Sequence, residues 1–147
     1  GRGAIFLGLP GTGKTHLATA IGMAVMKRNG ASVMFATVAR AVRHVKDSWS
    51  RDSGRTESEA IALMTNPDLL ILDEVGVQTG SDFEKNLLFD VINERYSRRR
   101  PTIFLSNLSL PEITAYLGER VMDRLREDGG TAIPFTWGSH RKTEGAA

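Results

Sequence analysis

The sequence predicts an α/β fold in which helices cover both faces of a parallel sheet. Short runs rich in Val, Ile, Leu and Phe recur along the 147 residues, as is typical of strands that are buried on both faces. Helical patterns separate these runs, and this alternation indicates a parallel sheet. We expect strands at residues 4–7, 32–37, 68–73, 102–106 and 132–137.

The first strand runs into a glycine-rich loop. Residues 8–15 read Gly-Leu-Pro-Gly-Thr-Gly-Lys-Thr, which fits the P-loop pattern G-x-x-x-x-G-K-[ST]. Its glycines allow positive φ, and its N–H groups and the following helix can hold a polyphosphate. Lys14 provides a charge for the phosphates, and Thr15 provides a hydroxyl for Mg²⁺. We expect ATP or ADP to contact Gly8, Pro10, Gly11, Thr12, Gly13, Lys14, Thr15 and His16. The alternative is a glycine-rich turn that carries Lys-Thr by coincidence.

Helical spacing predicts the remaining elements. The helix after the P-loop ends near Gly30, and its apolar face comprises Leu17, Ala18, Ile21, Val25 and Met26. A second helix begins near Val38, where Val42, Val45 and Trp49 continue an apolar stripe. This stripe favours core packing of Trp49 over base stacking. Further helices are expected at residues 57–64, 83–96, 111–117 and 119–126, with a polar loop at 50–55.

Two acids follow the third strand. Ligands of open α/β sheets bind at the carboxyl ends of the strands, so Asp73 is placed to hold Mg²⁺ opposite Thr15. Glu74 is placed to activate a water for attack on the γ-phosphate, and adjacent acids favour hydrolysis over transfer to a small acceptor. The alternative is that Asp73 caps a loop and that Glu74 is only solvated.

The fourth strand also ends in polar residues, Ser106 and Asn107. In P-loop ATPases that insert a strand between the two motif strands, a polar residue here contacts the γ-phosphate and the attacking water. The amide of Asn107 can donate to a phosphate oxygen and accept from a water. The alternative for Asn107 is an Asx-turn before Pro111.

The order of these motifs, followed by an arginine-containing segment, resembles the AAA+ ATPases. Residues 73–79 (Asp-Glu-Val-Gly-Val-Gln-Thr) and 118–126 (Gly-Glu-Arg-Val-Met-Asp-Arg-Leu-Arg) narrow the resemblance to the DnaC-type loaders of the bacterial replicative helicase, phage relatives included. An IstB-type transposition-helper ATPase shares this core and is the alternative. The resemblance implies a single AAA+ domain over residues 1–147, a P-loop NTPase αβα sandwich with strand order 5-1-4-3-2 and no helical lid domain.

The resemblance also implies assembly. AAA+ proteins self-associate with ATP at subunit interfaces, where an arginine of one subunit completes the site of its neighbour. Arg124 matches this finger best, Arg120 is the nearby alternative, and Arg141 matches a second, sensor-like arginine. The loaders grip the replicative helicase through an N-terminal region, and a segment upstream packs on adenine. We expect both to be missing from this chain.

The family is similar to replication initiators that line a channel with single-stranded DNA. Arg40, Arg43 and Lys46 lie at i, i+3 and i+6, which predicts a basic stripe along a phosphate backbone. Ser81 is a candidate phosphate contact. Phe83 is a candidate base contact, and its alternative is core packing.

Composition excludes several classes of protein. The absence of cysteine excludes disulfides and thiolate metal sites. No apolar run is long enough to span a bilayer, so we expect a cytoplasmic protein without membrane contacts. A net charge of +2 permits nucleic-acid binding without requiring it, and the basic run at residues 98–100 is expected to be a solvated loop. Slow hydrolysis of Mg·ATP is expected, the alternative being an ATP-dependent switch for single-stranded DNA with negligible turnover.

Overall fold

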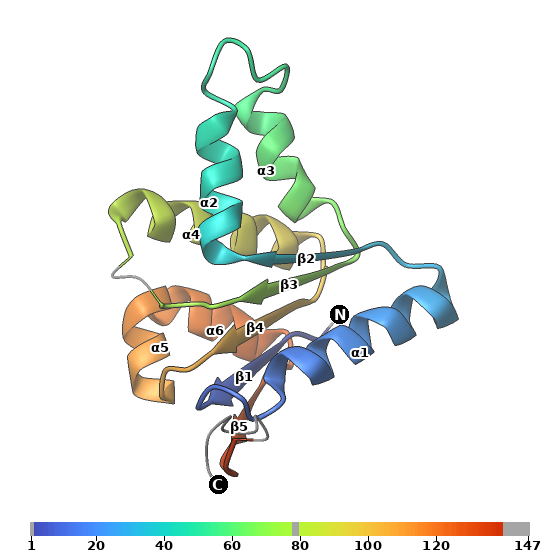
Figure 1. The fold of residues 1–147 in the computed structure, drawn as a ribbon, viewed down its shortest axis with the longest axis vertical. Helices are drawn as coiled ribbons and strands as arrows, with labels where there is room; N and C mark the ends of the chain where they lie inside the picture. The colour runs from blue at the N-terminus through green and yellow to red at the C-terminus, as the bar shows by residue number, and fades with distance from the viewer. Residues whose placement is uncertain (1, 78–79, 140–147) are drawn as a thin grey trace, which may run out of the picture.

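A computed structural model describes residues 2–77 and 80–139 (Figure 1). In this part of the chain, five parallel strands form one sheet in the order β2-β3-β4-β1-β5. The strands are β1 (Ala4–Gly8), β2 (Val33–Thr37), β3 (Leu69–Asp73), β4 (Thr102–Ser106) and β5 (Thr131–Phe135). Read from the other edge, this is the predicted order 5-1-4-3-2, so the predicted fold class is confirmed.

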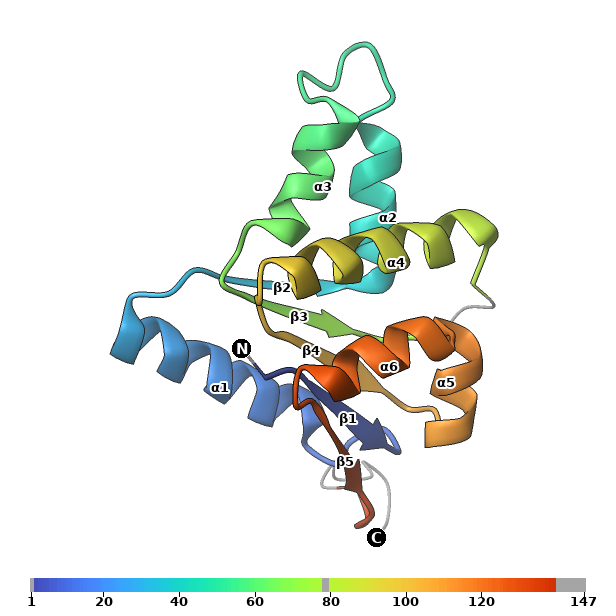
Figure 2. The ribbon, with the colours of Figure 1, turned by 180° about the vertical axis from the view of Figure 1, so that it is seen from behind.

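Helices cover the two faces of the sheet unequally, as the two opposite views show (Figures 1 and 2). The helices are α1 (Lys14–Asn29), α2 (Val38–Asp47), α3 (Glu57–Thr65), α4 (Asp82–Ser97), α5 (Leu110–Leu117) and α6 (Glu119–Glu127). Only α1 lies on one face among the described residues, over a small apolar cluster. The larger cluster lies under α4, α5 and α6 and extends between α2 and α3, which project as a pair beyond the β2 edge.

The starts of the helices divide into two kinds. Four helices begin after a Ser or Thr hydroxyl that accepts the N–H three residues on, and these pairs are Thr37–Arg40, Thr56–Glu59, Ser81–Glu84 and Ser109–Glu112. Helices α1 and α6 begin instead after Gly13 and Gly118, which offer no side-chain cap. The α1 start therefore carries N–H groups and a dipole that suit an anion.

The buried face of α1 differs from the predicted one. Ala18 and Gly22 are buried, whereas Leu17 is 41% exposed and Met26 is 45% exposed, so the prediction that both face the core was wrong. Gly22 explains the difference, because a Cβ there would lie 3.2–3.3 Å from side-chain carbons of Val33 and Ile71. The helix approaches the sheet through Gly22 and turns Leu17 and Met26 outward, whereas Ile21 and Val25 pack against the sheet as predicted.

A buried arginine closes the amino end of the sheet. Arg95, near the end of α4, is 1% exposed. Its guanidinium donates to the carbonyl oxygens of Pro67 and Pro101, both at 2.7 Å, and its Nε donates to the Thr102 hydroxyl at 2.9 Å. Burial lowers the pKa of Arg95 to about 10, so the side chain stays charged at neutral pH. Arg95 thus ties α4 to the loop before β3 and to the start of β4.

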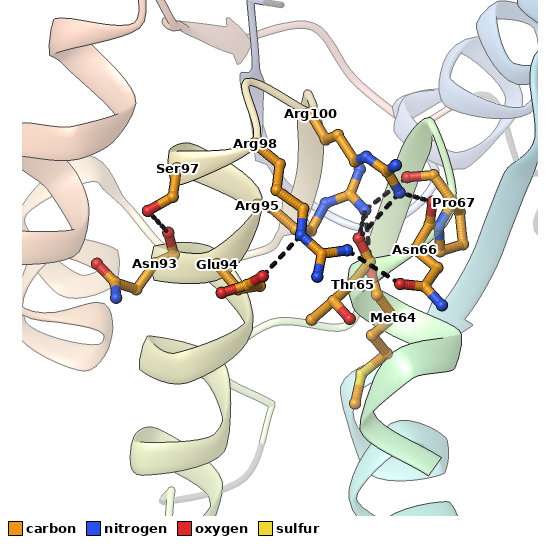
Figure 3. A network of polar contacts seen from close by, with 10 residues as sticks. All are labelled: Met64, Thr65, Asn66, Pro67, Asn93, Glu94, Arg95, Ser97, Arg98 and Arg100. Atoms are coloured by element: carbon orange, nitrogen blue, oxygen red, sulfur yellow. Dashed lines mark hydrogen bonds and ion pairs between the residues drawn. The ribbon is translucent and has the colours of Figure 1, made fainter. Parts of the chain in front are cut away.

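Two neighbouring arginines reinforce this junction (Figure 3). Arg98 forms an ion pair with Glu94 at 2.6 Å and donates to the Asn66 side-chain oxygen at 3.1 Å. Arg100 donates to the Asn66 carbonyl oxygen. The prediction of a solvated loop at residues 98–100 holds for the exposed Arg98 and Arg99. It was wrong for Arg100, which is half-buried because the end of α3 presents the Asn66 carbonyl to it.

Candidate nucleotide site

A cavity of about 530 Å³ lies at the carboxyl edge of the sheet. It is lined by Pro10, Gly11, Gly13, Lys14, Thr15, His16, Asp73, Glu74 and Asn107. These residues follow β1, β3 and β4, which are neighbours in the sheet, so their carboxyl ends meet. The cavity brings together three motifs that are far apart in the sequence. The P-loop residues Gly8 and Thr12 lie outside its lining.

The P-loop glycines adopt the predicted backbone conformation. Gly8, Gly11 and Gly13 have φ values of 148°, 77° and 95°. At Gly8 a Cβ would lie 2.4 Å from the Phe135 carbonyl oxygen, so a side chain is excluded. At Gly13 a Cβ would meet no atom within 4 Å, so this position needs glycine for its conformation and not for space.

The lysine of the loop is buried. Lys14 is 7% exposed, and its Nζ donates to the carbonyl oxygens of Gly8 at 2.6 Å and Leu9 at 2.8 Å. The Thr12 hydroxyl also donates to Leu9, at 2.8 Å. A cation surrounded by carbonyl dipoles inside the loop favours a phosphate, because an anion gives it a full counter-charge.

Thr15 and Asp73 meet across the cavity. The Thr15 hydroxyl donates to Asp73 Oδ2 at 3.1 Å, and Asp73 Oδ1 accepts the Glu74 N–H at 2.7 Å. The Asp73 carboxylate therefore caps its own loop, as the alternative interpretation expected, and it also faces the P-loop. Hydroxyl and carboxylate oxygens are the ligands that Mg²⁺ prefers, so this pair fits the ion.

Glu74 is held in an unusual backbone conformation. Its φ is 55°, which is uncommon for a residue with a side chain. The next residue is fixed by β4, because the Val75 N–H donates to Leu105 at 3.0 Å and the Ser106 hydroxyl donates to the Val75 carbonyl at 2.7 Å. These bonds hold the exposed Glu74 carboxylate at the cavity. Strain at a cavity-lining acid is typical of a functional position.

Asn107 lies on the cavity wall with an exposed side chain. The turn after β4 uses Ser106, whose hydroxyl accepts the Leu108 N–H at 3.1 Å. The Asx-turn considered for Asn107 is not seen among the described residues. Its amide is thus left at the cavity beside Glu74.

The predicted finger arginines lie elsewhere. The Arg124 guanidinium lies over the Tyr96 ring, 5.0 Å from its centroid, and the Tyr96 hydroxyl donates to Glu127 at 2.7 Å. Arg120 is exposed near the start of α6. Neither Arg120 nor Arg124 lines the nucleotide cavity. Arg141 lies outside the described residues.

The structure places an aromatic pair beyond α2. Trp49 is 54% exposed, so the prediction that it packs in the core was wrong. It follows the end of α2, whose buried face is Val38, Ala41 and Val45, and it therefore leaves the apolar stripe. Its ring meets Phe83 edge to face with centroids 5.2 Å apart, and Lys46 Nζ lies 5.5 Å from the Phe83 centroid. The polar residues 50–55 after Trp49 were the signal for exposure.

The three residues of the predicted basic stripe, Arg40, Arg43 and Lys46, do not lie together. Arg40 and Arg43 are exposed and line a hollow between β2, α2 and α3, whereas Lys46 faces Phe83. Two steps of three residues rotate around a helix by about 120° in total, so Lys46 is turned toward α4 while Arg40 remains at the hollow. Ser81 caps α4 by accepting the Glu84 N–H at 3.2 Å.

Fold and site together define a P-loop ATP-binding protein of the AAA+ class. A family model described as "IstB-like ATP binding protein" matches residues 2–128. This chain belongs to that family.

Comparisons with individual proteins confirm the predicted resemblance to DnaC-type loaders. The chain is 44% identical to the replicative helicase loader DnaC of Escherichia coli (strain K12) over 137 residues, which are 93% of this chain and 55% of that protein. It spans about half the length of the curated relatives it matches. A crystal structure of the DnaC helicase loader matches with a TM-score of 0.76 and 27% identity, covering 93% of this chain and 78% of that one.

A second solved structure is the replication initiator DnaA bound to AMPPCP and single-stranded DNA. It matches with a TM-score of 0.73 and 25% identity, covering 90% of this chain and 40% of that chain. Within residues 2–77 and 80–139, no helix is both long and apolar enough to cross a membrane.

Proposed function

We propose that this chain binds Mg·ATP in the carboxyl-edge cavity and hydrolyses it slowly. The observation that carries the proposal is that one cavity is lined by Lys14, Thr15, Asp73, Glu74 and Asn107. When bound beside Thr15 and Asp73, Mg²⁺ neutralises phosphate charge. Reactions at this cavity would take place in the cytoplasm.

The side chains divide the chemistry between them. The Lys14 ammonium exchanges its carbonyl partners for phosphate oxygens, which gives it a charged partner. Glu74 accepts a proton from the attacking water, and Asn107 orients that water against the γ-phosphate. Attack breaks the bond between the γ-phosphorus and the bridging oxygen, so ADP leaves with that oxygen and inorganic phosphate is released.

An arginine from a second copy completes this site in the proposal. Arg124 and Arg120 of the same chain do not line the cavity, which supports a role in trans at a subunit interface. Arg124 is the first candidate, and Arg120 is the alternative. Arg141 is proposed as a sensor of the bound nucleotide within the same chain.

We further propose that the chain loads a replicative helicase onto single-stranded DNA. The support is the 44% identity with the E. coli loader and the exposed Trp49 ring, which contacts the half-buried Phe83 beside Lys46. A base stacked on an exposed aromatic ring contributes about 1–3 kcal/mol. The Ser81 hydroxyl accepts the helix cap and can still donate its hydrogen to a phosphate. Arg40 and Arg43 would follow the backbone on the other side of α2.

Two variants test the nucleotide site. Lys14→Ala should lose tight Mg·ATP binding, because the phosphates lose their main side-chain counter-charge. Glu74→Gln should bind Mg·ATP as the wild type does and lose about 10²–10⁴-fold in turnover, since only water activation is removed. Asp90→Asn, an exposed acid of α4, is the control for a lost charge. Unchanged turnover of Glu74→Gln would refute the hydrolytic role.

Two further assays distinguish the remaining functional hypotheses. Hydrolysis measured with and without single-stranded DNA separates a motor from a switch, because a switch binds DNA in response to ATP with negligible turnover. Trp49→Ala or Phe83→Ala should weaken DNA binding by about tenfold each. Loading of purified replicative helicase onto DNA supports the loader. Failure to load, with stimulation of a transposase, supports the IstB-type helper, the alternative consistent with the description of the matching family model as IstB-like.

A further inference from the structure

The segment after β5 folds back onto the P-loop through one side chain. Trp137 Nε1 donates to the Thr12 carbonyl oxygen at 2.8 Å, although the two residues are 125 positions apart. The Trp137 ring lies against Phe135 with centroids 4.8 Å apart, and Phe135 lies against Phe6 of β1 at 5.4 Å. A row of three aromatic rings therefore links the core under the P-loop to the outside of the loop.

This hydrogen bond acts on a peptide unit that is loosely packed on its Gly13 side, whereas the Thr12 side chain is buried and donates to Leu9. The Thr12 carbonyl belongs to the peptide that joins Thr12 to Gly13, and no residue of the described chain has a cis peptide bond. Gly13 has a φ of 95°, and a Cβ there would meet no atom within 4 Å. Glycine populates both signs of φ at little cost, so packing at Gly13 does little to oppose rotation of this peptide.

The orientation of the peptide decides what the cavity offers to a ligand. In a trans peptide the C=O and N–H groups point in opposite directions. With the Thr12 oxygen bound to Trp137, the Gly13 N–H points away from Trp137. Gly13 lines the nucleotide cavity, whereas Thr12 and Trp137 do not. The bond therefore presents a donor to the cavity, and a rotated peptide would present a carbonyl oxygen that repels phosphate.

We propose that Trp137 is a positioning residue for phosphate binding, because its indole N–H locks the Thr12–Gly13 peptide with the N–H facing the cavity. This inference rests on the proposed nucleotide function of the cavity. Trp137 touches neither the reacting atoms nor the metal ligands in this role. It lowers the cost of ordering the loop before the ligand arrives, which increases affinity through preorganisation.

Trp137→Phe is the informative variant, because phenylalanine retains the ring contact with Phe135 and removes the donor. Affinities for Mg·ADP and for Mg·pyrophosphate are measured by calorimetry, with the melting temperature of each variant. We expect Trp137→Phe to weaken both ligands by the same factor, about threefold to tenfold, as for one lost hydrogen bond. Tyr96→Phe makes the same type of change at the opposite end of the sheet, and both affinities should stay at the wild-type value.

Trp137→His retains a ring N–H and should recover part of the lost affinity, and it carries the test if Trp137→Phe does not fold. Unchanged affinity of Trp137→Phe for both ligands would overturn the proposal. A loss for Mg·ADP alone would also overturn it, because Trp137 would then act as a stacking surface for the base. If the wild-type chain binds neither ligand, the proposed nucleotide function itself fails, and that result is distinct from a variant effect.

Discussion

The two ends of the sheet differ in whether their charged side chains are buried and hydrogen-bonded or exposed. At the amino end, the buried Arg95 guanidinium donates to five main-chain carbonyls, those of Met64, Thr65, Pro67, Asp68 and Pro101. At the carboxyl end, Glu74 is exposed and strained, and α1 starts without a side-chain cap. The amino end is closed by the protein itself, whereas the carboxyl end leaves donors and charges for a ligand.

Helix α4 joins these two ends and shows the contrast within one element. It begins after the Ser81 cap, with Phe83 half-buried near its start and turned toward Trp49. It ends with Arg95 buried against the loop that follows α3. A helix fixed firmly at one end can hold binding residues at its other end in a constant position.

The largest expected effect concerns a finger arginine, since no arginine of the described residues lines the cavity at the carboxyl end. Arg124 stacks on Tyr96, and it does not line the cavity of its own subunit. If it acts in trans, Arg124→Ala should bind nucleotide normally and lose hydrolysis, by about 10³–10⁵-fold in the best cases. Mixing Arg124→Ala with Glu74→Gln should restore activity, because hybrid interfaces contain one intact finger and one intact base.

The mixing assay needs assembled protein, so it is run at high protein concentration or with single-stranded DNA. Hydrolysis by the mixture is compared with the sum of the two variants measured alone. A mixture that never exceeds this sum shows that Arg124 is not a finger in trans. Arg120→Ala is then tested in the same way, since Arg120 lies one turn earlier on α6.

The next largest effect should come from removing the buried Arg95 side chain at the amino end of the sheet. Arg95→Leu removes the donors for several buried carbonyls, and we expect the free energy of unfolding to fall by about 3–5 kcal/mol. Arg98→Leu is the control, because its ion pair is half-exposed and should contribute less than about 1 kcal/mol. Urea denaturation measures both variants. Equal effects for the two would show that Arg95 does not close this end of the fold.

Local patterns explain why much of the fold and site was predictable. The P-loop, the acids after β3 and Asn107 after β4 all follow strands whose apolar runs are continuous in the sequence. Once the strands are parallel, their carboxyl ends share one edge, so the cavity lining follows from the strand assignments.

The remaining features depend on packing between distant segments. Trp49 leaves the helical stripe because α2 ends at Asp47, and helix ends are poorly specified by periodicity. Arg95 meets carbonyl groups about 30 residues away in sequence, and Trp137 meets Thr12 across nearly the whole chain. No local pattern predicts these contacts, since each needs the three-dimensional arrangement of two elements.

The smallest expected effect on stability, and one of opposite sign, concerns strain at the carboxyl end. Glu74 has a φ of 55° and follows Asp73, so it combines an unfavourable backbone conformation with an adjacent like charge. Asparagine tolerates the left-handed region better and carries no charge. Glu74→Asn should therefore raise the free energy of unfolding by about 0.5–1 kcal/mol while hydrolysis is lost.

Urea denaturation and steady-state hydrolysis are measured on the same preparation of Glu74→Asn, with Asp90→Asn as the control at an ordinary helical position of α4. The control should leave both quantities close to the wild-type values, because Asp90 is exposed and outside the cavity. A more stable but inactive Glu74→Asn would show that the strained backbone at residue 74 is retained because hydrolysis needs the carboxylate. Lower stability would mean that Glu74 also supports the fold, so that the two ends of the sheet differ less than their contacts indicate.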